Sequence, residues 1–268
     1  MRGRLQGACA SLFLSVLCSA AASGEPALDL ALVLAVDVSS SMTADEQELQ
    51  RLGFVEAFRS PQVHRAIGRG ALGRIAVVYV EWSGADEQSV LVPWTLIDGP
   101  EAARSFAAGL KRKPLRRLGM TSISGAIGSG IRLFAELGHE PLRRVIDISG
   151  DGPNNDGRKV THMRDHATAE GVTINGLPIM IGGPASEPDM ADLDAYYEDC
   201  VIGGPGSFMI PLRHKDQFPT VIQAKILREI AGSGGGSSLV LPAGSRADCL
   251  AGEKRRKADE AFGGEGNP

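Results

Sequence analysis

The sequence has no excess of positive charge. Its 268 residues include 28 Lys and Arg against 32 Asp and Glu, which gives a formal net charge of −4. Proteins that bind nucleic acids neutralise phosphates with clustered basic side chains. The one basic cluster, Lys111–Lys113 with Arg116 and Arg117, surrounds Pro114 and is interpreted as a solvated connector. The charge pattern therefore predicts no nucleic-acid partner.

A hydrophobic run long enough to cross a membrane is also missing. The apolar stretch from Ala8 to Ala22 is shorter than the roughly 20 residues of a comfortable transmembrane helix. Arg2 and Arg4 precede it, and small residues follow it as far as Gly24, which is typical of a cleaved secretory signal. We predict a signal peptide over residues 1–24, with an uncleaved anchor as the alternative. The mature protein is expected to be periplasmic or secreted, without a stable membrane span.

Cysteine is scarce. The chain has 4 cysteines, and Cys9 and Cys18 fall in the predicted signal peptide, so the mature protein keeps only Cys200 and Cys249. In an oxidising compartment two cysteines favour one disulfide, here one that would attach the C-terminal tail to the domain. Two unpaired thiols are the alternative. The tail, residues 232–268, is Gly-rich and then charged, and we expect a flexible linker followed by disorder from Glu253 onward.

Residues 25–231 have the composition and the pattern of one globular domain. Apolar residues make up 43% and charged residues 22% of the chain. The nearly continuous apolar run from Leu28 to Val36 indicates a strand buried on both faces, and an amphipathic stretch from Thr43 to Arg59 indicates a helix. Further strands are predicted at 74–82, 89–97, 143–149, 172–181 and 207–212, and further helices at 101–110, 121–137, 158–170, 189–199 and 214–231.

This alternation predicts an α/β fold with a mostly parallel six-stranded sheet and helices on both faces. The connection over residues 83–87 is short, which favours an antiparallel pair, and Pro93 places the third strand at an edge. Gly125, Gly128 and Gly130 weaken the helix that begins near Thr121, so we expect this helix to pack very close to the sheet.

Three polar loops are predicted at the carboxyl edge of the sheet, where ligands bind in such folds. They cover Asp37–Ser41, Gly119–Ser122 and Ser149–Gly152. Alternate residues of an extended segment share one side, so Asp37, Ser39 and Ser41 could converge on one ion. Their carboxylate and hydroxyl oxygens suit Mg²⁺, Mn²⁺ or Ca²⁺. Because such a site carries few charges, its cation would attract a carboxylate from outside.

The order Asp37-x-Ser39-x-Ser41, then Thr121, then Asp151 resembles the metal-ion-dependent adhesion site of von Willebrand factor A domains, over roughly residues 29–231. The phrase YYEDCVIGGPGSFM further resembles a secreted bacterial branch of that fold. The resemblance implies a doubly wound sheet with one antiparallel edge strand. It also implies that the three hydroxyls contact the metal directly, while the two carboxylates act through water or orient the hydroxyls.

The third loop departs from the family pattern. The family often has Thr-Asp-Gly there, whereas this chain has Ser149–Gly152, which leaves Asp147 and Asp156 as rivals of Asp151. Simpler roles also exist for single residues, because Ser41, Thr43 or Thr121 could cap a helix and Asp151 could be a turn residue. The occurrence of all three loops in the family's order favours the metal site.

These features predict a binding module in which the cation captures an Asp or Glu carboxylate of a protein partner. The sequence has no evident nucleophile–base pair, which favours binding over catalysis. A metal-dependent hydrolase is one alternative, with His162 as its candidate base. A structural domain stabilised by a metal is another. His162 and His166 have the spacing of a zinc pair, but residue 163 is Met163 and a solvated helix face is the preferred interpretation.

Overall fold

The computed structural model describes residues 28–116, 118–181, 192–232 and 247–263. The predicted signal peptide and the Gly-rich part of the tail, residues 233–246, lie outside this part of the chain. The strands are β1 Leu30–Asp37, β2 Ile75–Trp82, β3 Gln88–Ile97, β4 Arg144–Gly150 and β5 Val172–Pro178. The helices are α1 Ala44–Arg59, α2 Pro61–Gly68, α3 Pro100–Lys111, α4 Ile123–Glu136, α5 Val160–Ala169, α6 Leu193–Tyr196, a π-helix Tyr197–Val201, a 3₁₀ turn Lys215–Gln217, α7 Phe218–Ala231 and α8 Ala251–Gly263.

The sheet has the strand order β3-β2-β1-β4-β5, with β1 at its centre. β1 pairs in parallel with β2 and β4, and β4 pairs in parallel with β5. β3 runs antiparallel to β2 at the edge, which confirms the role predicted for the strand that contains Pro93. Because β1 and β4 are parallel neighbours, the loops that follow Asp37 and Gly150 leave the sheet at the same edge.

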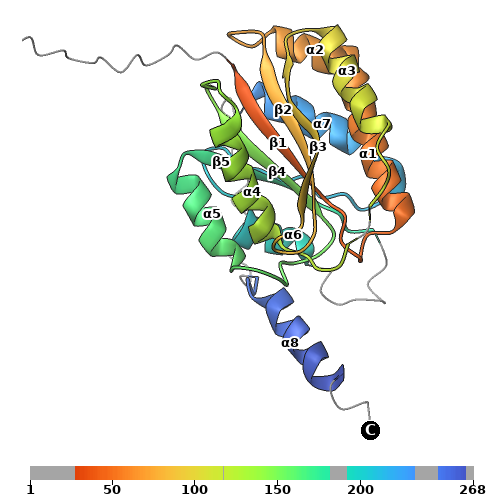
Figure 1. The fold of residues 1–268 in the computed structure, drawn as a ribbon, viewed down its shortest axis with the longest axis vertical. Coiled ribbons are helices and arrows are strands. Elements are labelled where there is room, and N and C mark those ends of the chain that lie inside the picture. Colours follow the sequence, from red (N-terminus) through yellow and green to blue (C-terminus); the bar gives the residue numbers. More distant parts are fainter. Residues whose placement is uncertain (1–27, 117, 182–191, 233–246, 264–268) are drawn as a thin grey trace, which may run out of the picture.

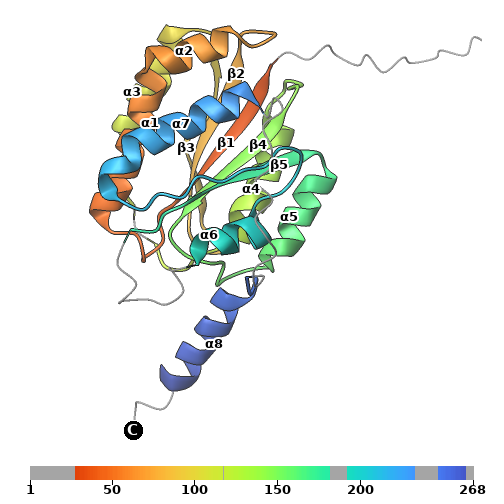
Figure 2. The ribbon, with the colours of Figure 1, turned by 180° about the vertical axis from the view of Figure 1, so that it is seen from behind.

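Helices cover both faces of the sheet (Figures 1 and 2). Successive side chains of a strand point to opposite faces of the sheet, so alternate residues of β1 pack in two different hydrophobic cores. Leu32 and Leu34 pack in the cluster that contains α1, α3 and α7 residues, and Val33 and Ala35 pack in the cluster that contains α4 and α5 residues. The α/β class, the mostly parallel sheet and the covered faces are therefore as predicted.

The Gly-rich helix α4 lies very close to its neighbours, as its sequence predicts. A Cβ on Gly130 would lie 2.6 Å from Cδ1 of Ile146 in β4, and a Cβ on Gly125 would lie 2.8 Å from the carbonyl oxygen of Ala85. At Gly128 the space is ordinary, since the nearest atom would be Cε of Met163 at 3.4 Å. Two of the three glycines are thus explained by close approach.

The sheet has five strands, so the prediction of six is wrong. The segment Ser207–Leu212 runs beside β5 but makes only isolated parallel bridges, Gly176 to Met209 and Ile179 to Leu212. Backbone hydrogen bonds connect the two segments, including Ile210 N to Gly176 O at 3.1 Å. Pro178 interrupts this pairing, because proline has no N–H to donate between the bonds that Gly176 and Met180 donate to the segment.

The prediction of disorder from Glu253 onward is wrong for the residues that the structure describes. Residues Ala251–Gly263 form α8, which projects from the carboxyl edge of the domain (Figure 1). The segment is rich in Ala, Glu, Lys and Arg, which are strong helix formers. The prediction of disorder considered only its charge and its glycines. A disulfide joins Cys200 of the π-helix to Cys249, just before α8, as the cysteine count predicts.

Within the described ranges, no helix combines the length and the apolar character that crossing a membrane requires.

Candidate metal site

The first loop leaves the buried end of β1. The side chains of Asp37 and Ser39 are fully buried, and Ser41 is exposed. The backbone N–H of Ser39 donates to Oδ1 of Asp37 at 2.7 Å, which folds the loop back on the strand end. The hydroxyl oxygens of Ser39 and Ser41 are 2.9 Å apart. The alternation in the sequence therefore brings these three side chains to one side, as expected.

The third loop meets the first directly. The hydroxyl of Ser41 donates to Oδ1 of Asp151 at 2.6 Å, although the two residues are 110 positions apart in the chain. Asp151 follows the last residue of β4, Gly150, and is buried. Asp37 is thus connected to Asp151 through the backbone N–H of Ser39 and then through the hydroxyls of Ser39 and Ser41.

The second loop contributes Thr121. Its side chain is buried and lines the same pocket, of about 580 Å³, as Ser41 and Asp151. Its backbone fixes the third loop, since its N–H donates to Oδ1 of Asn155 at 2.9 Å and its carbonyl accepts from Asn155 N at 2.8 Å. The structure thus brings all three loops together, with Asp37 and Ser39 buried and the other three residues at the pocket.

Helix capping does not account for Ser41 or Thr121. The N-cap of α1 is Thr43, which forms a capping box with Glu46. The N-cap of α4 is Ser122, whose hydroxyl accepts from the N–H of Gly125 at 3.1 Å. Because these neighbours satisfy the helix ends, the simpler role considered for Ser41 and Thr121 is absent.

The electrostatics of the site centre on Asp37. Burial, followed by the nearby charge of Asp151, raises the pKa of the Asp37 carboxyl well above its usual range. Its Oδ2 atom is buried and has no hydrogen-bond partner. A buried carboxylate oxygen without a partner is costly, and two close carboxylates repel each other. A cation between the loops would relieve both penalties.

The two rivals of Asp151 have other roles. Asp147 lies in the middle of β4, where its Oδ1 is 3.0 Å from Nζ of buried Lys225. Asp156 accepts hydrogen bonds from the N–H of Ala85 at 2.9 Å and from Arg256 at 2.8 Å, which hold the third loop in place. Neither carboxylate lines the pocket that Thr121 and Asp151 share.

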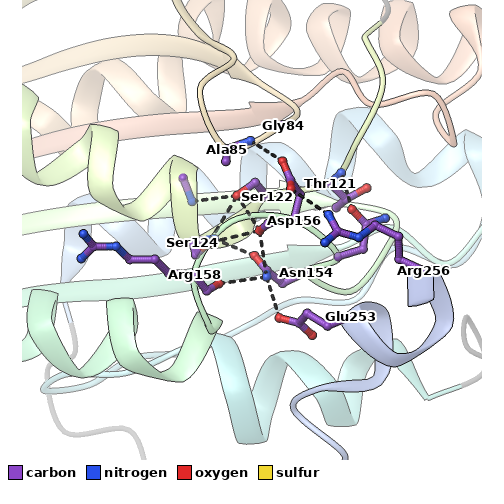
Figure 3. Close-up of polar contacts among 12 residues, drawn as sticks. Gly84, Ala85, Thr121, Ser122, Ser124, Asn154, Asp156, Arg158, Glu253 and Arg256 are labelled. Atoms are coloured by element: carbon purple, nitrogen blue, oxygen red, sulfur yellow. Dashed lines mark hydrogen bonds and ion pairs between the residues drawn. The ribbon is translucent and has the colours of Figure 1, made fainter. Parts of the chain in front are cut away.

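Sequence reasoning missed Asn154, which ties the third loop to its surroundings (Figure 3). Its buried side-chain amide accepts from the N–H of Ser124 at 2.9 Å. It donates to the carbonyl oxygen of Arg158 at 3.1 Å and to Oε1 of Glu253 at 2.9 Å. One amide thus joins α4, the third loop and α8, and no local motif in the sequence signals a contact of this range.

Two adjacent tyrosines behind the site were also missed. The hydroxyl of Tyr197 donates to the carbonyl of Gly150 at 3.4 Å, and the hydroxyl of Tyr196 accepts from the N–H of Asn154 at 3.1 Å. Both side chains are buried. In the sequence, the phrase that begins with these tyrosines carries only a family resemblance, because its support of the third loop depends on the fold.

Histidine does not contribute to the pocket. His162 and His166 are exposed on α5, and His166 pairs with Glu170 at 3.3 Å. Among the residues that the structure describes, no group of three or more His, Cys, Asp or Glu side chains is arranged to hold a metal. Any cation at the three loops would rely on the hydroxyls together with the two carboxylates.

Comparisons with solved structures give the fold. Three similar structures are proximal thread matrix protein 1 from the mussel byssus (16% identity, TM-score 0.54), a von Willebrand factor type A protein from Catenulispora acidiphila (15%, 0.51) and a pilus adhesin from Lactobacillus rhamnosus GG (11%, 0.56). The matches cover 77%, 76% and 76% of this chain, but only 49%, 43% and 31% of those chains. The chain therefore spans about half or less of each.

Comparison with curated proteins gave no match. The model of the family described as "Protein of unknown function (DUF1194)" matches residues 27–234, which is most of the chain and includes all three loops. The sheet order, the loops at its carboxyl edge and the structural matches agree on a von Willebrand factor A-like fold. The chain belongs to the DUF1194 family, whose fold is of this type.

Proposed function

We propose that this protein is an exported binding module in which a divalent cation, held by Asp37, Ser39, Ser41, Thr121 and Asp151, captures a carboxylate of a protein partner. The hydrogen-bonded path from Ser39 through Ser41 to Asp151 carries the proposal. It joins two loops that are far apart in sequence, and Thr121 faces the same pocket. Neither Ser41 nor Thr121 is needed to cap the helix that follows it.

The donor set fits a hard cation. Carboxylate and hydroxyl oxygens suit Mg²⁺, Mn²⁺ or Ca²⁺ and suit soft metals poorly. The unpartnered Oδ2 of Asp37 and the repulsion between Asp37 and Asp151 are the features that a cation would offset. The hydroxyls bring no charge, so the bound cation would stay electron-poor and bind an incoming carboxylate.

Export is supported by two observations. The N-terminal sequence has the pattern of a secretory signal, and the disulfide between Cys200 and Cys249 is of a kind that persists in oxidising compartments. A periplasmic or secreted location follows from the proposal. One of the similar structures is a pilus adhesin, which is consistent with a binding role for this fold.

Hydrolysis is less well supported. A hydrolase with a metal-activated water also needs a positioned general base. His162, the candidate base, is exposed on α5 and is absent from the lining of the pocket. A metal that only stabilises the fold is the remaining alternative. The second experiment below distinguishes it from a metal that captures a partner.

Calorimetric titration of the exported, purified protein with Mg²⁺, Mn²⁺ and Ca²⁺ tests the proposal. We expect saturable binding at one site, lost in Asp37→Ala and in Thr121→Ala. Thr43→Ala is the matched control, because Thr43 is a hydroxyl residue beside the site whose role is to cap α1. Its cation affinity should equal that of the parent. A folded parent that binds none of the three ions would contradict the metal site.

A second measurement separates capture from stabilisation. An immobilised acidic peptide should retain the cation-loaded protein and release it on chelation, while circular dichroism shows that the chelated protein stays folded. If chelation unfolds the domain and no acidic peptide is retained, the cation has a structural role instead.

A further inference from the structure

The pocket above the three loops has a second wall, which α8 supplies. Besides Ser41, Thr121 and Asp151, the pocket is lined by one stripe of α8, formed by Gly252, Arg255, Arg256, Asp259 and Glu260. These positions recur at intervals of three or four, so they share one face of the helix. The helix lies beyond residues 27–234, where the family model matches. This wall therefore lies outside the residues that the family model matches.

The base of α8 is fixed to the third loop. A Cβ on Gly252 would lie 2.2 Å from the carbonyl oxygen of Asn154, so only glycine allows the helix to lie this close. Glu253 accepts a hydrogen bond from Asn154 at 2.9 Å, and Arg256 binds Asp156 at 2.8 Å (Figure 3). The disulfide at Cys249 adds a covalent attachment just before the helix. The stripe thus has a defined position relative to the site.

The charges on the stripe change sign along the helix. The turn next to the loops carries Arg255 and Arg256, and the following turn carries Asp259 and Glu260. Because α8 points away from the domain, the acidic turn lies further from the loops (Figures 1 and 2). One helical turn is about 5.4 Å, close to the roughly 6.6 Å spanned by two residues of an extended chain.

We propose that the stripe on α8 is a charge-ordered wall of the ligand site and selects an extended acidic peptide segment. This rests on the proposed function, in which the first carboxylate of the segment reaches the cation. A second acidic side chain, two residues away, would face the basic turn of Arg255 and Arg256, where Arg256 also pairs with Asp156 at 2.8 Å and with Glu260 at 3.5 Å. A basic side chain, two residues further, would face Asp259 and Glu260. The pocket volume of about 580 Å³ falls in the range of sites that hold ligands of this size.

Two peptides of the same composition test the order of charges. Acetyl-DGDGK-amide matches the wall in one orientation, whereas acetyl-DGKGD-amide has a basic residue in the middle in either orientation. Blocked ends remove the terminal charges. With Mg²⁺ at saturation, we expect the first peptide to bind about fivefold more tightly than the second, the size of effect that exposed ion pairs produce.

Variants of α8 show whether the wall causes the preference. Asp259→Lys with Glu260→Lys should abolish it, because the outer turn then repels the basic side chain. Ala258→Lys with Ala261→Lys is the matched control. It adds two lysines to the same part of the helix at exposed positions outside the pocket lining, and should keep the preference. Both variants should bind Mg²⁺ like the parent.

The outcomes separate this inference from the function on which it rests. Metal-dependent binding of both peptides with equal affinity would overturn the role of α8 and leave the cation site intact. Equal loss of preference in both double variants would also overturn it, since bulk charge would then explain the effect. Absence of metal-dependent binding to either peptide by the parent would contradict the proposed function together with this inference.

Discussion

Asp37 and Tyr197 enclose Gly150 so closely that a side chain there has no space. A Cβ on Gly150 would lie 2.9 Å from Oδ2 of Asp37 and 3.1 Å from the hydroxyl oxygen of Tyr197. Burial, and then the charge of Asp37, raises the pKa of Tyr197 well above its usual range, so the phenol stays protonated and can donate to the Gly150 carbonyl. The packing of Gly150 and Tyr197 therefore leaves the unpartnered oxygen of Asp37 little room to move.

The first prediction concerns Gly150→Ala. The added methyl must push Asp37 or Tyr197 aside, and overpacking of this kind costs about 1–3 kcal/mol. We expect a lower free energy of unfolding in urea and about tenfold weaker Mg²⁺ binding, since about 1.4 kcal/mol corresponds to a factor of ten. Gly68→Ala is the control, because a Cβ on Gly68 meets nothing within 4 Å. If both variants bind Mg²⁺ like the parent, the position of Asp37 does not limit binding.

The second prediction concerns the charge of Asp37. Its pKa is raised in the folded protein and ordinary, about 3.9, in the unfolded chain. The folded state then binds the proton more tightly, so stability from this group is present below pH 4 and is lost as the pH rises toward the folded pKa. Asp37→Asn keeps an acceptor for the N–H of Ser39 and removes the charge.

We therefore expect Asp37→Asn, without divalent cations at pH 7, to be more stable than the parent by about 1 kcal/mol, a common size for such changes. The advantage should shrink as the pH is lowered toward 4, and saturating Mg²⁺ should reverse the order at pH 7. Urea unfolding at several pH values measures this. A variant less stable than the metal-free parent at pH 7 would show that the buried carboxylate is already compensated.

How far the sequence predicted this structure depends on the range of the contacts involved. The strand that ends at Asp37 and the strand that ends at Gly150 are local patterns, and parallel pairing then places their loops side by side. The hydroxyls of Ser41 and Thr121 were ambiguous until Thr43 and Ser122 proved to be the caps. Which hydroxyl caps a helix depends on backbone angles that the sequence does not state.

Other features could not be read from local patterns. The position of the wall formed by α8 depends on the close packing of Gly252 against Asn154. These two residues belong to segments about a hundred positions apart in the chain. Composition suggested disorder there, because it counts charge and glycine without their positions. The sixth strand was wrong for a different reason: an apolar run indicated a strand, but Pro178 of the neighbouring strand lacks a donor needed for regular pairing.

The third prediction concerns the disulfide. Replacing Cys200 and Cys249 by Ala opens a link that spans 49 positions, and loss of such a bond costs about 2–4 kcal/mol. The domain should stay folded, because both main cores lie within its sheet and covering helices. Hydrogen exchange should speed up over α8, residues Ala251–Gly263, more than over α7. Reductant should destabilise the parent but not the double variant, and equal sensitivity of the two would contradict the assignment.

The fourth prediction concerns the buried ion group under α7. Nζ of Lys225 lies 3.0 Å from Oδ1 of Asp147 and 2.8 Å from Oε1 of Glu229, and all three side chains are buried. Lys225→Met would leave two buried carboxylates without their cation. Removing one partner of a buried pair costs about 3–5 kcal/mol. We expect this loss in urea unfolding at pH 7, and a smaller one at pH 5, because burial raises the pKa of the Asp147 carboxyl to about 7 and this group is then protonated.

Lys215→Met is the control for this fourth prediction, because it also removes a lysine from an ion pair. Nζ of Lys215 lies 3.3 Å from Oε1 of Glu46, but the lysine is 47% exposed. Exposed pairs contribute below about 1 kcal/mol, since water and salt screen them. The two substitutions should therefore differ by several fold in cost at pH 7. If Lys225→Met costs no more than Lys215→Met, the buried lysine does not hold α7 to the sheet through its ion pairs.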